Sequence, residues 1–139
     1  MRRYVHQTRC SVDPDRLYRA LSDIRRWPEW DDGLEWTRIE APARTGAAFV
    51  LKPRGGPKVA MQVEAAQAPH RFVDLARLPL ARMRTVHEFV LTESGTLVTI
   101  VIEVFGPLAL VWDRLVARKQ AAGSAAQTQR LIAFAGALP

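Results

Sequence analysis

The chain has 139 residues, of which 48% are hydrophobic, and a formal net charge of +6. A chain of this length is expected to form one domain, residues 1–139, and can bury a core that needs no disulfide or metal to reinforce it. Its only cysteine, Cys10, excludes an internal disulfide and indicates a reducing compartment.

The N-terminus lacks the features of a secretory signal, because two arginines lead into an alternating stretch and no apolar segment follows. The most apolar run, residues 97–112, is interrupted by Glu103 and Gly106, so we expect no transmembrane span. These features predict a cytoplasmic protein.

The basic residues are scattered and form only short pairs, such as Arg25-Arg26. No nucleic-acid-binding motif is present, so we expect no nucleic-acid partner. His6 and His70 have no partner at the spacing of metal ligands, and the chain lacks the HExxH, phosphate-loop and GxSxG patterns. The sequence therefore predicts neither a metal site nor a cofactor.

The first part of the chain predicts one strand followed by two short helices. Residues 3–10 alternate as a strand does. Asp13 and Pro14 are typical of the N-cap and the first position of a helix, which is expected to run to about Leu21. A second short helix is expected up to Pro28, which ends it.

Six further strands are predicted between residues 34 and 105, and Gly55-Gly56 is the strongest turn signal between them. The expected strands are 34–40, 47–52, 58–66, 71–77, 82–91 and 96–105. One strand, two helices, six strands and a final helix predict an α+β fold with an antiparallel sheet.

The glycine turn leaves the pairing of its two strands open. A two-residue turn would place Met61 opposite Val50, whereas a one-residue slip would place it opposite Phe49 or Leu51.

A long helix is predicted from Pro107 to about Ala137, with a bend at Gly123. Its first half is amphipathic, because apolar residues recur at helical spacing: Leu108, Val111, Trp112 and Leu115. Residues 121–126 are small and cannot fill the space between this helix and a sheet. We therefore expect an internal pocket beside them.

Turn positions predict how the last two strands pair. A two-residue turn at residues 94–95 would place His87 opposite Ile102. The same turn would place Phe89 opposite Ile100. The partners on this side are apolar throughout, so this side is expected to face the core.

The preceding hairpin leads to the same face. A tip at residues 80–81 would place Asp74 opposite His87. It would also place Phe72 opposite Phe89. Both hairpins therefore predict that these four side chains share the inner face of the sheet.

Several short motifs, in this order, resemble the START, birch-pollen-allergen and polyketide-cyclase superfamily, also called SRPBCC. The resemblance covers nearly the whole chain. It is carried by residues 13–18, Leu21-Ser22-Asp23, Trp27-Pro28-Glu29-Trp30, Gly95-Thr96 and Gly106-Pro107-Leu108. Residues 71–74, 78–79 and 87–89 resemble a bacterial polyketide-cyclase-like subgroup.

The resemblance implies a helix-grip fold, in which a curved seven-stranded antiparallel sheet wraps around the C-terminal helix and two short helices lie between strands one and two. It also implies an apolar cavity between the sheet and that helix. Members of the superfamily bind lipids, sterols, polyketides or plant hormones, some transport lipids, and some cyclise polyketides.

The notable polar residues on the expected inner face are Asp74 and His87. Residues opposed on one face lie about 5 Å apart at Cβ, close enough for a carboxylate to bond an imidazole. Such a pair can act as a general base near neutral pH, although burial would oppose the charged imidazole. The alternative is a buried bond that only satisfies both groups.

Apolar and aromatic residues of the strands and the final helix are expected to line the pocket and contact a flat or hydrophobic ligand. For the aromatic residues, ordinary core packing is the alternative. The candidate ligand-binding residues are Trp30, Trp36, Phe49, Met61, Phe72, Phe89, Ile100, Ile102, Leu115 and Ala122.

Three functions are compatible with this pattern. The first is binding of a small hydrophobic molecule without turnover. The second is a polyketide cyclase or dehydratase that uses the Asp74–His87 pair. The third is a partner-binding protein with a filled core and an exposed apolar patch. The chain is expected to be a monomer or a homodimer.

Overall fold

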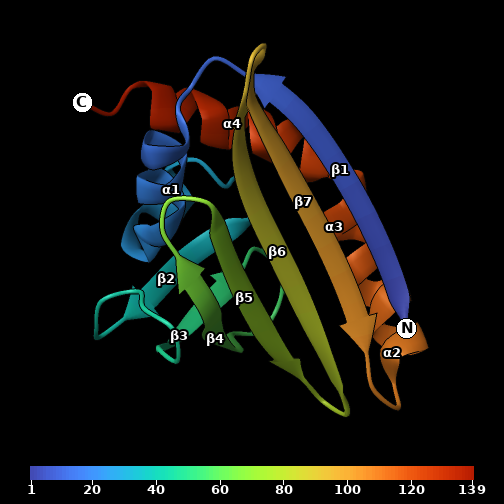
Figure 1. Cartoon of the computed structure of the whole chain (residues 1–139). Coiled ribbons are helices and arrows are strands. Elements are labelled where there is room, and N and C mark those ends of the chain that lie inside the picture. Colours follow the sequence, from blue (N-terminus) through green and yellow to red (C-terminus); the bar gives the residue numbers. More distant parts are fainter.

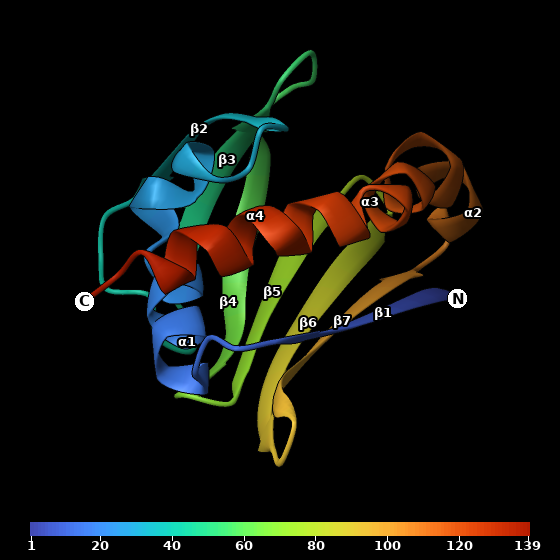
Figure 2. The same cartoon turned by 90° about the horizontal axis from the view of Figure 1, so that it is seen from above.

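The computed structural model describes all residues from Met1 to Pro139 and contains a seven-stranded antiparallel sheet with the strand order β1-β7-β6-β5-β4-β3-β2. The sheet is curved, and the helices lie on its concave side (Figures 1 and 2). This confirms the predicted helix-grip architecture. The strands are β1 (Arg2–Cys10), β2 (Leu34–Ile39), β3 (Ala48–Pro53), β4 (Val59–Gln67), β5 (Arg71–Leu78), β6 (Ala81–Thr92) and β7 (Gly95–Phe105).

Two short helices lie between β1 and β2, as predicted: α1 (Pro14–Ser22) and the 3-10 helix η1 (Ile24–Glu29). The Asp13 side chain caps α1 by accepting a hydrogen bond from the backbone N–H of Arg16 at 3.1 Å. Contrary to the prediction, Pro28 does not end the second helix but lies inside it. The fixed φ of proline is compatible with a helical turn, which loses only the bond of the missing N–H.

The predicted final helix is divided into four segments: α2 (Ala109–Trp112), the π-helical turn η2 (Asp113–Ala117), α3 (Arg118–Ala122) and α4 (Ser124–Gly136). Gly123 separates α3 from α4, at the predicted bend. Figure 2 shows α4 crossing the concave side of the sheet, whereas α3 and α2 turn away from its direction. None of the helices has the length and apolar character that a membrane-spanning segment needs.

The concave side of the sheet and the helices share one apolar cluster of 27 buried residues. Phe72 and Phe89 are its largest fully buried side chains, and α4 contributes Leu131 and Ala135. Burial of this surface is the main force that holds the C-terminal helix against the sheet.

The predicted register of β6 and β7 is wrong by two residues. His87 pairs with Ile100 and Phe89 with Val98, because the first residue of β7, a glycine, is still paired and the turn consists of residues 93–94. A slip of two residues leaves every side chain on its predicted face.

The predicted register of β5 and β6 is wrong by the same amount. Phe72 pairs with His87, and Asp74 pairs with Thr85. The turn is formed by residues 79–80, where proline suits the first turn position and Leu80 adopts a positive φ of 55°. Asp74 and His87 are therefore diagonal neighbours on one face and do not lie directly opposite.

At the glycine turn, Met61 pairs with Phe49, which was one of the open alternatives. Both residues are buried in the shared core. The observed register therefore keeps the large side chains on the concave face.

Gly95 begins β7 with a φ of +119°, and a Cβ atom built on it would lie 2.5 Å from the backbone oxygen of Cys10. We expect Gly95→Ala to lower the free energy of unfolding by roughly 2 kcal/mol or more, through strain and the contact with the neighbouring strand end. Chemical denaturation measures this change.

Gly55→Ala is the matched control, because Gly55 also has a positive φ, +75°, but has no atom within 4 Å of the added Cβ. Gly55→Ala should lower the free energy of unfolding only by the cost of placing alanine at a positive φ, about 1 kcal/mol. Equal losses in the two variants would contradict the close approach at Gly95.

Candidate functional site

Asp74 on β5 and His87 on β6 lie on the concave face, where they are 6% and 8% exposed. The distance between Asp74 Oδ2 and His87 Nδ1 is 4.0 Å, which is too long for a hydrogen bond. The two groups are thus neighbours within the apolar core without a direct bond between them.

Asp74 and His87 both have polar atoms without a hydrogen-bond partner in the protein. His87 Nδ1 lies 3.2 Å from the backbone oxygen of Phe72, so this nitrogen carries the proton that it donates to the carbonyl. The other ring nitrogen, Nε2, then has a free lone pair. The Asp74 carboxyl group forms no hydrogen bond with another protein group, which is unusual for a buried polar side chain.

Burial sets the protonation of both groups. It raises the pKa of Asp74 to about 7. It lowers the pKa of His87 to about 4, against a smaller opposing effect of the hydrogen bond to the Phe72 carbonyl. Near pH 7 the imidazole is therefore neutral and the carboxyl is close to half protonated. Burial therefore has more influence on the charge of the imidazole than the neighbouring carboxylate does.

Aromatic side chains of the core come from α1, β5 and the segment around η1, and of these Phe72 also lies beside the His87 ring, with 6.5 Å between ring centroids. The Phe72 ring packs edge-on against Tyr18 of α1, with 6.0 Å between ring centroids. Trp30, which follows η1, packs against Trp27 at 6.4 Å. The Trp30 indole Nε1–H is buried and has no hydrogen-bond partner. The core therefore contains an unpaired donor as well as the unpaired carboxyl of Asp74.

The helix side of the core contains two further polar residues, Ser124 and Thr128 of α4. The Ser124 hydroxyl donates to the backbone oxygen of Gln120 at 3.1 Å. Sequence reasoning missed both polar residues, although residues 124, 128, 131 and 135 have the spacing of one helix face and could have identified them.

Most of the predicted ligand-binding residues belong to the shared core: Trp30, Phe49, Met61, Phe72, Phe89, Ile100 and Ile102. Three lie elsewhere. Leu115 is 56% exposed, Ala122 is exposed, and Trp36 is half-buried on the convex face beneath the guanidinium of Arg38.

The small residues of the final helix do not line the interior as expected. Ala122 and Gly123 are exposed, and Ser124 is the only buried residue between positions 121 and 126. The chain bends at this point, so the run faces mostly outward. The prediction that this run borders an internal pocket is therefore wrong.

Two open grooves lie at the surface, away from Asp74 and His87. One, of about 490 Å³, is on the outer side of β2, β3, β4 and β5, and Arg38 and Arg77 are among its lining residues. The other, of about 210 Å³, lies between residues 22–25 and 39–43. No group of three or more His, Cys, Asp or Glu side chains is arranged to hold a metal ion.

Removing Asp74 and removing His87 are expected to change the pH dependence of the free energy of unfolding in opposite directions. The raised pKa of Asp74 favours folding at low pH, and this contribution is lost as the pH rises from about 4 to about 7. The lowered pKa of His87 favours folding above about pH 6.5, and this contribution is lost as the pH falls to about 4. In the wild type the two effects largely cancel.

His87→Gln should therefore become less stable, relative to the wild type, as the pH rises from about 4 to about 7, by on the order of 3 kcal/mol. Asp74→Asn should change in the opposite direction over nearly the same range. Urea denaturation at several pH values measures both slopes. Parallel profiles for the two variants and the wild type would contradict the assigned burial of the pair.

Comparisons with known proteins agree with this architecture. A family model described as "Polyketide cyclase / dehydrase and lipid transport" matches residues 1–134. No match was found among curated protein sequences.

Solved structures share the fold at low identity. Protein MLL2253 from Mesorhizobium loti is 19% identical with a TM-score of 0.75, and the match covers 96% of each chain. Ara h 8.0201 is 11% identical with a TM-score of 0.75, over 99% of each chain. The di-domain ARO/CYC BexL, from the BE-7585A biosynthetic pathway, is 16% identical with a TM-score of 0.76, over 99% of this chain and 51% of BexL.

The similarity to these solved structures shows only that the fold is shared. The family model, in contrast, matches nearly the whole sequence and therefore shows the family. The chain belongs to the polyketide cyclase / dehydrase and lipid transport family, within the SRPBCC superfamily.

Proposed function

We propose that the protein binds a small hydrophobic molecule in its interior, between the concave face of the sheet and the C-terminal helix. The observation that carries this proposal is the Asp74 carboxyl group, which is buried on the concave face of the sheet and receives no hydrogen bond from another protein group. Burial of such a group is costly unless something pairs with it. A bound molecule with a polar group would supply that partner.

The unpaired groups also indicate the chemistry of the ligand. Trp30 Nε1–H donates only, so it requires an acceptor such as a carbonyl oxygen. Asp74, with a pKa of about 7, can donate to a carbonyl or accept from a hydroxyl. His87 Nε2 can accept. The class that fits is a mainly apolar molecule with one or a few hydroxyl or ketone groups, as in lipids and polyketides.

The proposal is tested by filling the interior from the helix side. Thr128 is 3% exposed on the buried face of α4, so Thr128→Leu adds apolar bulk next to the core. The expected result is a loss of binding of roughly tenfold or more with a stability change below about 1 kcal/mol. Binding is followed with the fluorescent hydrophobic probe 8-anilinonaphthalene-1-sulfonate, and mass spectrometry of the extracted protein detects molecules that copurify.

Ala126→Leu is the matched control, because Ala126 is exposed on the same helix. It should leave both binding and stability unchanged. Should Thr128→Leu cost more than about 2 kcal/mol of stability while the wild type binds no probe, the interior is solid and the proposal is wrong.

A second candidate is a cyclase or dehydratase acting on a poly-β-ketone chain. The observation that favours it is the pKa of about 7 for Asp74, since a general acid or base works best when its pKa is near the working pH. Two structures of the same fold are described as di-domain ARO/CYC proteins of biosynthetic pathways. Proton abstraction beside a ketone, aldol closure and loss of water would need a carboxyl group in this state.

Asp74→Asn separates the two candidates, because asparagine keeps the size and polarity of the side chain but cannot exchange the proton. If the protein is a cyclase, conversion of a linear poly-β-ketone thioester, measured by liquid chromatography and mass spectrometry, should fall by roughly 100-fold or more. If it is a carrier, the wild type should show no conversion, and the variant should change only the affinity.

A further inference from the structure

One end of the molecule exposes large apolar side chains. Leu80 lies at the tip of the β5–β6 hairpin, and four more residues follow on the loop before α2 and on the outer side of α2 and η2. The exposed fractions are 65% for Leu80, 37% for Leu108, 61% for Leu110, 47% for Val111 and 56% for Leu115. We call these five residues the apolar end; the hairpin tip and α2 lie together at the bottom of Figure 1.

Hydrogen bonds join the two parts of the apolar end into one surface. The backbone N–H of Leu108 donates to the backbone oxygen of Leu80 at 2.9 Å. The Trp112 indole N–H donates to the backbone oxygen of Pro79 at 2.8 Å. The hairpin tip is therefore held against the start of the helix.

The helix at the apolar end buries small and charged residues and exposes its leucines. Its buried residues are Ala109, Asp113 and Ala117, two small and one charged, while its leucines face outward. The Tyr4 hydroxyl donates to Asp113 Oδ1 at 2.6 Å, and the π-helical turn begins at Asp113. An ordinary surface helix does the reverse and buries its leucines. Exposed apolar surface of this kind marks an interaction site.

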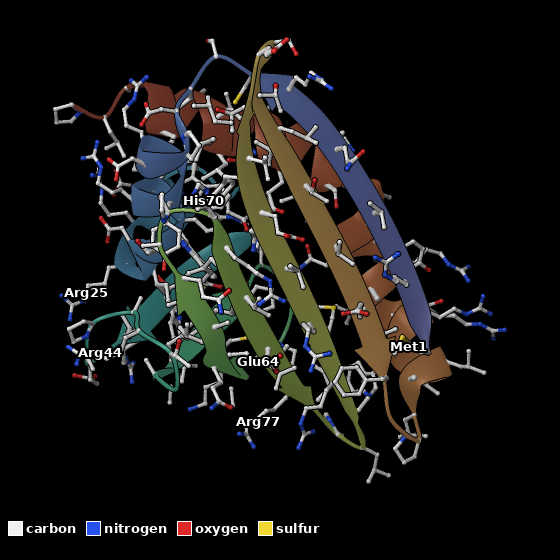
Figure 3. The ribbon with its side chains drawn as sticks, viewed as in Figure 1. Met1, Arg25, Arg44, Glu64, His70 and Arg77 are labelled. Atoms are coloured by element: carbon white, nitrogen blue, oxygen red, sulfur yellow. The ribbon has the colours of Figure 1, made fainter.

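The charge around the apolar end is positive. Arg114, Arg118 and Lys119 are exposed on the same helix. Asp113 is the only acidic residue between positions 104 and 139, and it is buried beneath Tyr4 and 3.5 Å from Arg118. Arg77 extends toward the same end of the molecule (Figure 3). The surface thus combines protruding leucines with cations and has no exposed carboxylate on the helix.

We propose that the apolar end docks on the surface of a lipid bilayer that contains anionic lipids. Leucines flanked by arginine and lysine on one exposed helix face are the pattern of an interfacial helix, whose apolar side chains enter the headgroup region while cations attract anionic lipids. A second copy of the chain fits less well, because an isologous contact would bring the same cations together. This inference goes beyond the proposed function and holds whether or not the interior binds a ligand.

Cosedimentation with vesicles tests the proposal. The wild type should bind vesicles of phosphatidylcholine with roughly one-third phosphatidylglycerol at least tenfold more strongly than vesicles of phosphatidylcholine alone. Binding should weaken in about 0.5 M salt, where charge interactions are screened. The double variant Leu110→Ser, Leu115→Ser should bind the anionic vesicles at least tenfold less.

The matched control is Val90→Ser, Leu91→Ser, because these residues are 50% and 67% exposed but lie in β6 near the opposite end of the sheet. It should bind as the wild type does. The proposal is overturned if the wild type does not bind anionic vesicles, or if the control variant loses as much binding as Leu110→Ser, Leu115→Ser. It is also overturned if the wild type forms a dimer that the leucine variant abolishes and vesicles do not compete with.

Discussion

The concave face of the curved sheet is apolar, and the C-terminal helix must cover it for the protein to fold. The helix does so with different residues along its length. In α4 the buried face includes Leu131 and Ala135, whereas in α2 and η2 it consists of small residues and Asp113. Small residues let the helix lie close to β1 and β7, and Tyr4 of β1 supplies the partner that the buried carboxylate needs. Polar pairing and apolar burial together therefore hold the helix in place.

Because the helices cover nearly all of the concave face, burial also controls the protonation of the polar residues in the core. Asp74 and His87 are 4.0 Å apart, a distance at which opposite charges would stabilise each other in water-accessible surroundings. In this core the loss of hydration outweighs that attraction, and both groups tend toward their neutral forms. A neutral pair can remain in an apolar interior and still present a donor and an acceptor. That combination suits a mainly apolar ligand with a polar group better than it suits a charged one.

The sequence predicted the architecture and the inner face, because side-chain alternation survives errors of two residues in register. Asp74 and His87 face inward as predicted, although the turns of both hairpins were predicted at the wrong residues. The errors arose where the local geometry departs from regular periods. A bulge between Leu34 and Trp36 moves Trp36 to the convex face. The start of the final helix buries Ala109, Asp113 and Ala117, so Leu115 and the apolar residues before the π-helical turn face outward. The bulge has no clear sequence signal, the choice of small residues and Asp113 as the buried helix face depends on the partner Tyr4 in a distant strand, and the extent of burial that shifts the pKa values depends on the whole fold.

The C-terminal helix would thus take part in both proposed activities, with α4 facing a ligand in the interior and α2 and η2 facing a bilayer. The Tyr4–Asp113 hydrogen bond lies between these two surfaces. It helps to set which side of the helix is buried, because turning the leucines inward would break this bond and leave the Tyr4 hydroxyl without its acceptor. The outward position of Leu110 and Leu115 is therefore linked to the Tyr4–Asp113 bond on the opposite side of the helix.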